Sequence, residues 1–297
     1  ISLKEACVEL GFLTAEKFDE VFHPEEMVWS GGIKMKVSYF PGCTLKNKAK
    51  DLDLYAYNED VNIIIENKVD SGINFVKKEN LKIIPLGGIE EIGKNITVFE
   101  YGNDIVLVDC GLAFPEDDML GVDLVIPDIT YLEKNKEKIR GLVITHGHED
   151  HIGSIPYLLK QFNVPIYGTK LTIGLIEHKL EEHKLLRSTK LKVVNLGQSI
   201  NLGSMRVEFI RTTHSIPDAC SLAIHTPVGV VVHTGDFKID YTPIDGEMMD
   251  FGRLAALGNK GVLALMSDST NSERKGYTMS ESTVGEVLDK LFINCTK

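Results

Sequence analysis

Short apolar runs, separated by glycine, proline or polar turns, dominate the chain after residue 80. Runs of this length that are rich in Val, Ile and aromatic residues are typical of β-strands. Gly102 and Asn103 separate two such runs and predict a hairpin turn. Strands are expected over residues 81–88, 95–101, 104–111, 141–144, 165–167, 190–195, 199–202, 205–210, 220–225, 229–233 and 262–266.

Between these strands the sequence predicts helices over residues 130–138, 154–162 and 171–185. A strand-rich chain with interspersed helices favours an α+β fold, in which two sheets pack face to face and helices cover the outside. The ends of the strands then bring the connecting loops to one edge. Because binding and catalytic residues concentrate on such loops, we expect the chemistry there.

Composition narrows the class of protein. With 297 residues, 43% of them hydrophobic, the chain can bury a sizeable core in one large or two modest domains. No apolar run is long enough to cross a bilayer, the first residues do not form a signal peptide, and the five scattered cysteines favour a reducing cytoplasm. The net charge of -11 argues against a freestanding nucleic-acid coat, but it is compatible with a nuclease whose metal ions hold phosphate.

The first 80 residues differ in character from the rest. Residues 1–33 predict one or two short helices and a tail, and the stretch from Ala6 to Met27 resembles the C-terminal tail of the aspartate ammonia-lyase and fumarase family. That resemblance includes none of the catalytic signature, so it implies no lyase activity. Residues 34–57 resemble the start of the cysteine-rich subunit of heterodisulfide reductase. Because the later cysteine pairs of that family are absent, we expect Cys43 to be an inert thiol and no iron–sulfur cluster.

Residues 58–80 are polar around one apolar patch, residues 61–65, and predict either a linker or an added edge strand. Tails of two unrelated families joined head to tail indicate a composite chain. We therefore expect a helical tail over 1–33, a strand and linker segment over 34–80, and one coherent domain over 81–297.

The segment Thr145–Gly153 carries the strongest chemical signal. It follows an apolar strand and places three histidines and an aspartate within six residues. Imidazole nitrogens and carboxylate oxygens are the ligands that zinc prefers. His146 and His148, two positions apart in an extended loop, can face one ion, whereas Asp150 and His151 can reach a second. The alternative is a solvated polar loop.

Two later residues complete the set. His214 and Asp236 each close an apolar strand, and each alone would more often be a capping or turn residue than a ligand. Together with the histidine loop they predict a dinuclear site. The first ion is assigned to His146, His148 and His214, the second to Asp150 and His151, and Asp236 lies between them.

The order HxHxDH, then His, then Asp at strand ends resembles the metallo-β-lactamase superfamily. This resemblance implies an αββα sandwich with two metal ions. The iron-bearing branch has HxExDH, so His148 at the third position favours two hydrolytic zinc ions over a redox di-iron centre. Manganese also suits the ligand set.

A closer resemblance, to the N-terminal portion of the ribonuclease J family of β-CASP enzymes, extends over residues 81–297. It implies 5′-to-3′ exonuclease and endonuclease activity on RNA, in RNA processing and decay, in the cytoplasm. The motifs that carry it are residues 84–88, 91–95, 145–153, 214–218, 233–238 and 267–271.

This resemblance implies that Asp236 bridges the ions and that Asp150 also orients the nucleophile, so both are catalytic candidates. Asp109 is expected to accept a hydrogen bond from a ligand histidine, with a turn aspartate as the alternative. His233 is expected to support the Asp236 loop. The candidates for contact with phosphate or for stabilisation of the site are Asp268, Ser269, Thr270 and, with a solvated lysine as the alternative, Lys238.

The chain stops about where the β-CASP insertion of that family would begin. We therefore expect an incomplete sandwich that lacks the family's last metal-ligand histidine, its 5′-phosphate pocket and its C-terminal interface between copies. Weak or no processive RNA degradation is the expectation for the chain alone. Two alternatives stay open: a stand-alone hydrolase of small esters or thioesters, and an inactive fragment or scaffold.

Overall fold

The computed structural model describes residues 63–65, 80–89 and 91–295. All of them belong to one compact unit, Phe40–Lys297. The predictions for residues 1–33 and 34–57, including Cys43, lie outside the described residues. Within segment 58–80, β1 (Ile63–Ile65) pairs antiparallel with β2, so this part forms the edge strand that was one of the two expectations.

One sheet has seven strands in the order β1-β2-β3-β4-β5-β6-β7. Its first four strands pair antiparallel, and β4 to β7 pair parallel because helices connect them. The remaining strands are β2 (Leu81–Gly87), β3 (Ile96–Tyr101), β4 (Asp104–Val108), β5 (Ile139–Val143), β6 (Ile166–Gly168) and β7 (Leu191–Val193).

The second sheet has five strands in the order β12-β11-β10-β9-β8. It is antiparallel except that β12 joins β11 in parallel. The strands are β8 (Ser199–Leu202), β9 (Met205–Arg211), β10 (Cys220–Thr226), β11 (Gly229–His233) and β12 (Ala264–Met266).

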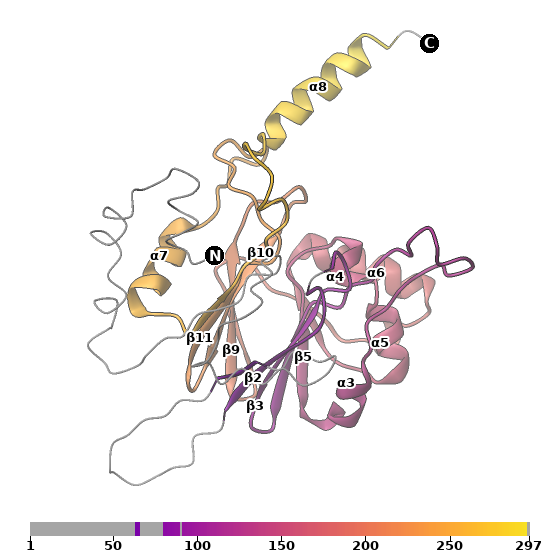
Figure 1. The fold of residues 1–297 in the computed structure, drawn as a ribbon, viewed down its shortest axis with the longest axis vertical. Helices are drawn as coiled ribbons and strands as arrows, with labels where there is room; N and C mark the ends of the chain where they lie inside the picture. Colours follow the sequence, from indigo (N-terminus) through magenta and orange to yellow (C-terminus); the bar gives the residue numbers. More distant parts are fainter. Residues whose placement is uncertain (1–62, 66–79, 90, 296–297) are drawn as a thin grey trace. The chain divides into compact units, whose positions relative to one another are not determined.

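The two sheets pack face to face, and helices cover the outer face of each (Figure 1). Successive residues of β4 face opposite sides of its sheet. Val106 faces the core between the two sheets with Phe209 and Leu222, whereas Leu107 faces the core between the sheet and its helices. A strand buried on both faces has a continuous apolar sequence. Each fully buried large side chain contributes about 1.5–3 kcal/mol. The structure therefore confirms the α+β sandwich.

Four helices lie beside the seven-stranded sheet: α3 (Thr130–Lys134), α4 (Glu149–Ile152), α5 (Ile155–Gln161) and α6 (Lys170–Glu182). The helix predicted over 130–138 divides into α3 and a 3₁₀ turn, Lys136–Lys138. A second 3₁₀ turn, Leu186–Ser188, follows α6.

Three of the described helices were not predicted, and one of them is α4, whose residues were expected to belong to a loop. α7 (Phe251–Lys260) covers the five-stranded sheet and buries Leu257 against Ile210 and Val232. α8 (Glu281–Ile293) projects away from both sheets and buries none of its residues (Figure 1). Among the described helices, none combines the length and the apolar character that a membrane crossing requires.

Candidate metal centre

The histidine loop begins where β5 ends. Thr145 is fully buried, and its backbone N–H donates to Oδ1 of Asp109 at 2.8 Å. His148 has extended backbone angles, φ -73° and ψ 152°, and caps the short helix α4. The chain therefore turns directly after His148, and the first turn of α4 brings Asp150 and His151 back towards the loop.

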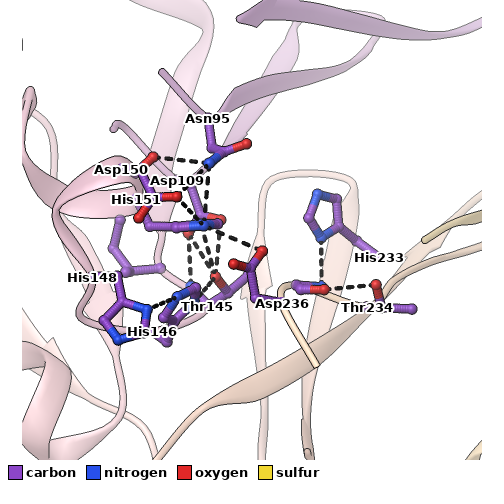
Figure 2. Close-up of polar contacts among 12 residues, drawn as sticks. Asn95, Asp109, Thr145, His146, His148, Asp150, His151, His233, Thr234 and Asp236 are labelled. Atoms are coloured by element: carbon purple, nitrogen blue, oxygen red, sulfur yellow. Dashed lines mark hydrogen bonds and ion pairs between the residues drawn. The ribbon is translucent and has the colours of Figure 1, made fainter. Parts of the chain in front are cut away.

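Three histidines form a first cluster. Nε2 of His146 lies 3.0 Å from Nδ1 of His148, and Nε2 of His214 lies 3.2 Å from the same Nδ1. Figure 2 shows the side chains of His146 and His148 next to each other, below Asp150. His214 comes from the other sheet, just after β9. The predicted ligand triad of the first ion is thus brought together.

A second cluster shares His146 with the first. One ligand atom each from His146, His151 and Asp236 lies within 4.8 Å of the others. Nε2 of His151 is 3.3 Å from Oδ1 of Asp236 and 3.5 Å from Oδ2 of Asp150. Asp150 therefore stands beside this cluster, as predicted for the second ion, and the shared His146 was not foreseen.

The donor set fits a divalent cation of the zinc type. Burial, together with the positive charge of His151, lowers the pKa of His146 to about 2. His146 therefore stays neutral and keeps a lone pair for a metal. Burial acts to raise the pKa of Asp236, but the hydrogen bond and charge of His151 outweigh it and hold that pKa well below its ordinary value. Asp236 therefore stays an anionic ligand.

Asp109 supports the second cluster through a contact with His151. It follows β4 with a φ of 62°, a conformation that non-glycine residues rarely adopt. Its buried Oδ2 lies 2.8 Å from Nδ1 of His151. A histidine that donates Nδ1–H to a carboxylate is oriented so that its Nε2 can lose its proton and bind a metal. The structure thus places Asp109 against His151, one of the candidate ligand histidines.

Thr145 fixes a second histidine, a role that the sequence did not reveal. Its Oγ1 lies 2.9 Å from Oδ2 of Asp109 and 3.0 Å from Nδ1 of His146. Since a carboxylate can only accept, the hydroxyl donates to Asp109 and accepts Nδ1–H of His146. Nε2 of His146, the atom nearest to His148, is thereby left free for a ligand bond.

Asn95 was also missed as a site residue. Its Nδ2 donates to the backbone oxygen of Asp150 at 3.0 Å and lies 3.2 Å from Nε2 of His151. Figure 2 shows this side chain reaching the pair from above. An asparagine at the start of a strand carries no local signal for such a role, because its partners lie 55 and 56 positions away.

The five-stranded sheet contributes the remaining loops. Asp236 follows β11, and Gly235 takes a φ of 57° at the turn. The backbone N–H of Gly235 donates to Nδ1 of His233 at 3.1 Å, which confirms the supporting role expected for His233 (Figure 2). Asp268 follows the adjacent strand β12, and its N–H donates to Oγ1 of Thr234 at 2.9 Å.

The phosphate candidates lie in two environments. Asp268 accepts from the N–H of Thr270 at 2.8 Å, and Ser269 lies between them. The pKa of His214 is lowered by burial, and the negative charges of Asp236 and Asp268 oppose this. Lys238 was expected to contact RNA or solvent. Instead its Nζ pairs with the Glu281 carboxylate in α8.

Known proteins resemble this chain over most of its length. A ribonuclease J from Synechocystis sp. is 59% identical over 214 residues, which are 71% of this chain and 33% of that protein. Ribonuclease J2 of Bacillus subtilis is 48% identical over 72% of this chain and 39% of its own length. The chain thus spans about a third of the length of the curated relatives it matches.

A solved structure of a protein of unknown function from Enterococcus faecalis shares the fold. It matches with a TM-score of 0.54 at 18% identity and covers 72% of this chain and 57% of that one. The family model of the metallo-beta-lactamase superfamily matches residues 90–254. This range contains both clusters and more than half of the chain. The chain belongs to the metallo-beta-lactamase superfamily.

Proposed function

We propose that residues 81–297 form the metal-binding part of an RNA phosphodiesterase of the ribonuclease J type. The observation that carries the proposal is the pair of clusters that share His146. Two adjoining cation sites suit the in-line displacement of a phosphodiester, in which both the attacking and the leaving oxygen need stabilisation. The similarity to ribonucleases J over this part of the chain supports RNA as the substrate.

The resident cofactor of this proposal is a pair of divalent cations, zinc by the softness of the imidazole-rich set, with manganese as the other fitting metal. When bound, the two cations supply a water of lowered pKa and neutralise charge on the phosphodiester. His146, His148 and His214 would hold the first cation. Asp150 and His151 would hold the second, and Asp236 would be shared by both.

Asp150 and Asp236 are the proposed catalytic residues. Asp236 stays ionised beside His151, so its oxygens serve the cations and not a proton. The Asp150 carboxylate is a third exposed, at 33%, and can therefore reach a water molecule from solvent and orient it. Asn95 fixes the backbone of Asp150, which keeps that carboxylate next to Nε2 of His151.

Phosphate contact is proposed for the loop after β12, where the hydroxyls of Ser269 and Thr270 can donate to anionic oxygens. The ion pair of Lys238 with Glu281 must open before its ammonium can reach RNA backbone. A cytoplasmic location and family-type association of copies belong to the same proposal.

Metal content and substrate choice test the proposal together. The purified chain is loaded with Zn²⁺ or Mn²⁺ and dialysed, and its metal is counted by mass spectrometry. It is then assayed in single turnover on a short 5′-monophosphorylated RNA and on a glutathione thioester. We expect near two ions per chain and slow cleavage of RNA, lost in Asp150→Asn and kept in the exposed-histidine control His178→Ala.

Two results would contradict the proposal. Fewer than one ion per chain favours an inactive scaffold. Thioester hydrolysis without RNA cleavage favours a small-molecule hydrolase on the same fold.

A further inference from the structure

Asp236 lies at the start of a long irregular segment. Residues 234–250, all of them described, form neither helix nor strand between β11 and α7. Ordering the backbone of such a segment costs about 1–2 kcal/mol for each residue. A fixed position for Asp236 therefore requires contacts that hold the segment in place.

The strongest of these contacts is made by Asp240, which is only 5% exposed. Its Oδ2 accepts from Oγ of Ser280 and from the backbone N–H of Glu281, both at 3.0 Å, and its Oδ1 accepts from the N–H of Thr242 at 3.0 Å. Ser280 is the residue that caps α8. The carboxylate thus binds the N-terminal end of that helix, where unpaired N–H groups favour negative charge.

Lys238 balances the negative charge of Asp240 and connects this segment to the loop that carries His214. Its Nζ pairs with Glu281, lies 3.8 Å from Oδ2 of Asp240, and donates to the backbone oxygen of Met279 at 3.2 Å. Its backbone N–H donates to the oxygen of Thr213 at 2.8 Å, and Oγ1 of Thr213 donates back to the oxygen of Lys238 at 2.5 Å. Thr213 directly precedes His214.

We propose that Asp240 is a positioning residue of the metal centre, which fixes Asp236 and His214 relative to each other by clamping their two segments onto the start of α8. This inference rests on the proposed metal-binding function. Asp240 contributes no atom to either cluster. Its effect reaches both clusters, because His214 belongs to the first and Asp236 to the second.

A second aspartate offers a matched control. Asp250 accepts from the N–H of Arg253 at 2.8 Å and caps α7, as Asp240 binds the start of α8. Asp240→Ala and Asp250→Ala therefore each remove a carboxylate from a helix N-terminus, but only the first lies in the clamp. Asp240→Asn keeps the acceptor for Thr242, and Ser280→Ala removes one clamp contact without leaving a large cavity.

The test measures metal affinity by titration with Zn²⁺ and amide hydrogen exchange of the metal-free chain. Removing a residue that orients metal ligands typically costs 10–100-fold in affinity. We expect Asp240→Ala to weaken Zn²⁺ binding by about 10-fold or more and to speed exchange over residues 211–215 and 234–242. Ser280→Ala should act in the same direction, Asp240→Asn should act less, and Asp250→Ala should change neither quantity in those segments.

Wild-type affinity and wild-type exchange in Asp240→Ala would overturn the inference, and so would equal effects in Asp250→Ala. If Asp240→Ala does not fold, the Zn²⁺ affinity and the amide hydrogen exchange of Ser280→Ala test the inference in its place. If the wild-type chain binds no Zn²⁺, the proposed function fails, and unchanged exchange around Asp236 in the variants then refutes the clamp independently.

Discussion

Nδ1 of His151 lies 2.8 Å from Oδ2 of Asp109, and both side chains are almost completely buried. The carboxylate holds the proton on Nδ1, so Nε2 is the nitrogen that can give up its proton and bind a metal. Burial alone would lower the pKa of His151, but the charge and hydrogen bond of Asp109 outweigh it and raise that pKa to about 10. Asp109 thus makes the ring a stronger base for any cation.

Asp109→Asn is expected to weaken metal binding without preventing folding. The amide is isosteric, but it carries no charge and offers one oxygen in place of two, so Thr145 and His151 compete for it. Loss of such a contact typically costs 10–100-fold in metal affinity. Titration with Zn²⁺ measures the change. The exposed Asp128, which accepts from Thr130 in a turn, provides the control Asp128→Asn, for which wild-type affinity is expected. Equal affinity in both variants would contradict the role of Asp109.

Nε2 of His146 lies near the ligand atoms of both clusters, but it has one lone pair and can bind one cation only. His146→Ala should therefore reduce the bound metal from near two ions per chain to about one. His148→Ala should likewise leave the second cluster, and hence about one ion. The measurement is metal content after dialysis, with His178→Ala as the control. Loss of both ions in His146→Ala would contradict the assignment of His146 to the first ion alone.

The strands could be predicted from their short apolar runs, which are continuous in β3, β4 and β5 because these strands are buried on both faces. α7 could not. Gly252 and Gly258 are poor helix formers, and the helix instead depends on the cap at Asp250 and on Arg253, whose guanidinium binds Glu208 45 positions away. The helix therefore forms despite its low intrinsic helix propensity, because contacts with residues distant in the sequence stabilise it.

The candidate site also has a part that could be predicted from the sequence and a part that could not. The candidate ligands His146, His148, Asp150 and His151 could be singled out because their spacing is local. The contacts that orient them come from distant segments, such as Asn95 on Asp150, and leave no periodic trace in the sequence.

Glu208 gives a prediction of pH dependence away from the metal centre. Burial acts to raise its pKa, but hydrogen bonds from Arg253 and His225 and their charges lower it below 4.5. A carboxyl group whose pKa is lower in the folded state stabilises the fold above its unfolded pKa and loses this contribution as the pH falls through its folded pKa. Glu208→Gln should therefore lower the free energy of unfolding by about 1–3 kcal/mol at pH 7.

The deficit of Glu208→Gln relative to wild type should shrink as the pH falls below about 4.5, where Glu208 is protonated in the unfolded chain, and vanish once the pH passes the lower pKa of the folded state. Urea unfolding at pH 7 and at successively lower pH measures it. Glu247, an exposed partner of Arg211 at 3.7 Å, supplies the control Glu247→Gln, with a change below about 1 kcal/mol. A deficit that does not change with pH would assign the effect to packing and not to charge.

Gly111 and Gly174 give opposite predictions for the same substitution. A Cβ on Gly111 would overlap the backbone oxygen of Asp150, so the start of α4 must move. Overpacking of this kind typically costs about 1–3 kcal/mol. Gly111→Ala should therefore lower stability and also weaken Zn²⁺ binding, since Asp150 and His151 move with α4.

Gly174 lies within α6, and a Cβ there meets nothing within 4 Å. Because alanine favours a helix interior, Gly174→Ala should raise stability by about 0.5–1 kcal/mol and leave Zn²⁺ binding unchanged. Thermal unfolding and Zn²⁺ titration of the two variants provide the comparison. Wild-type Zn²⁺ affinity in Gly111→Ala would mean that the placement of α4 does not control the second cluster, because that Cβ cannot be accommodated unless the start of α4 shifts.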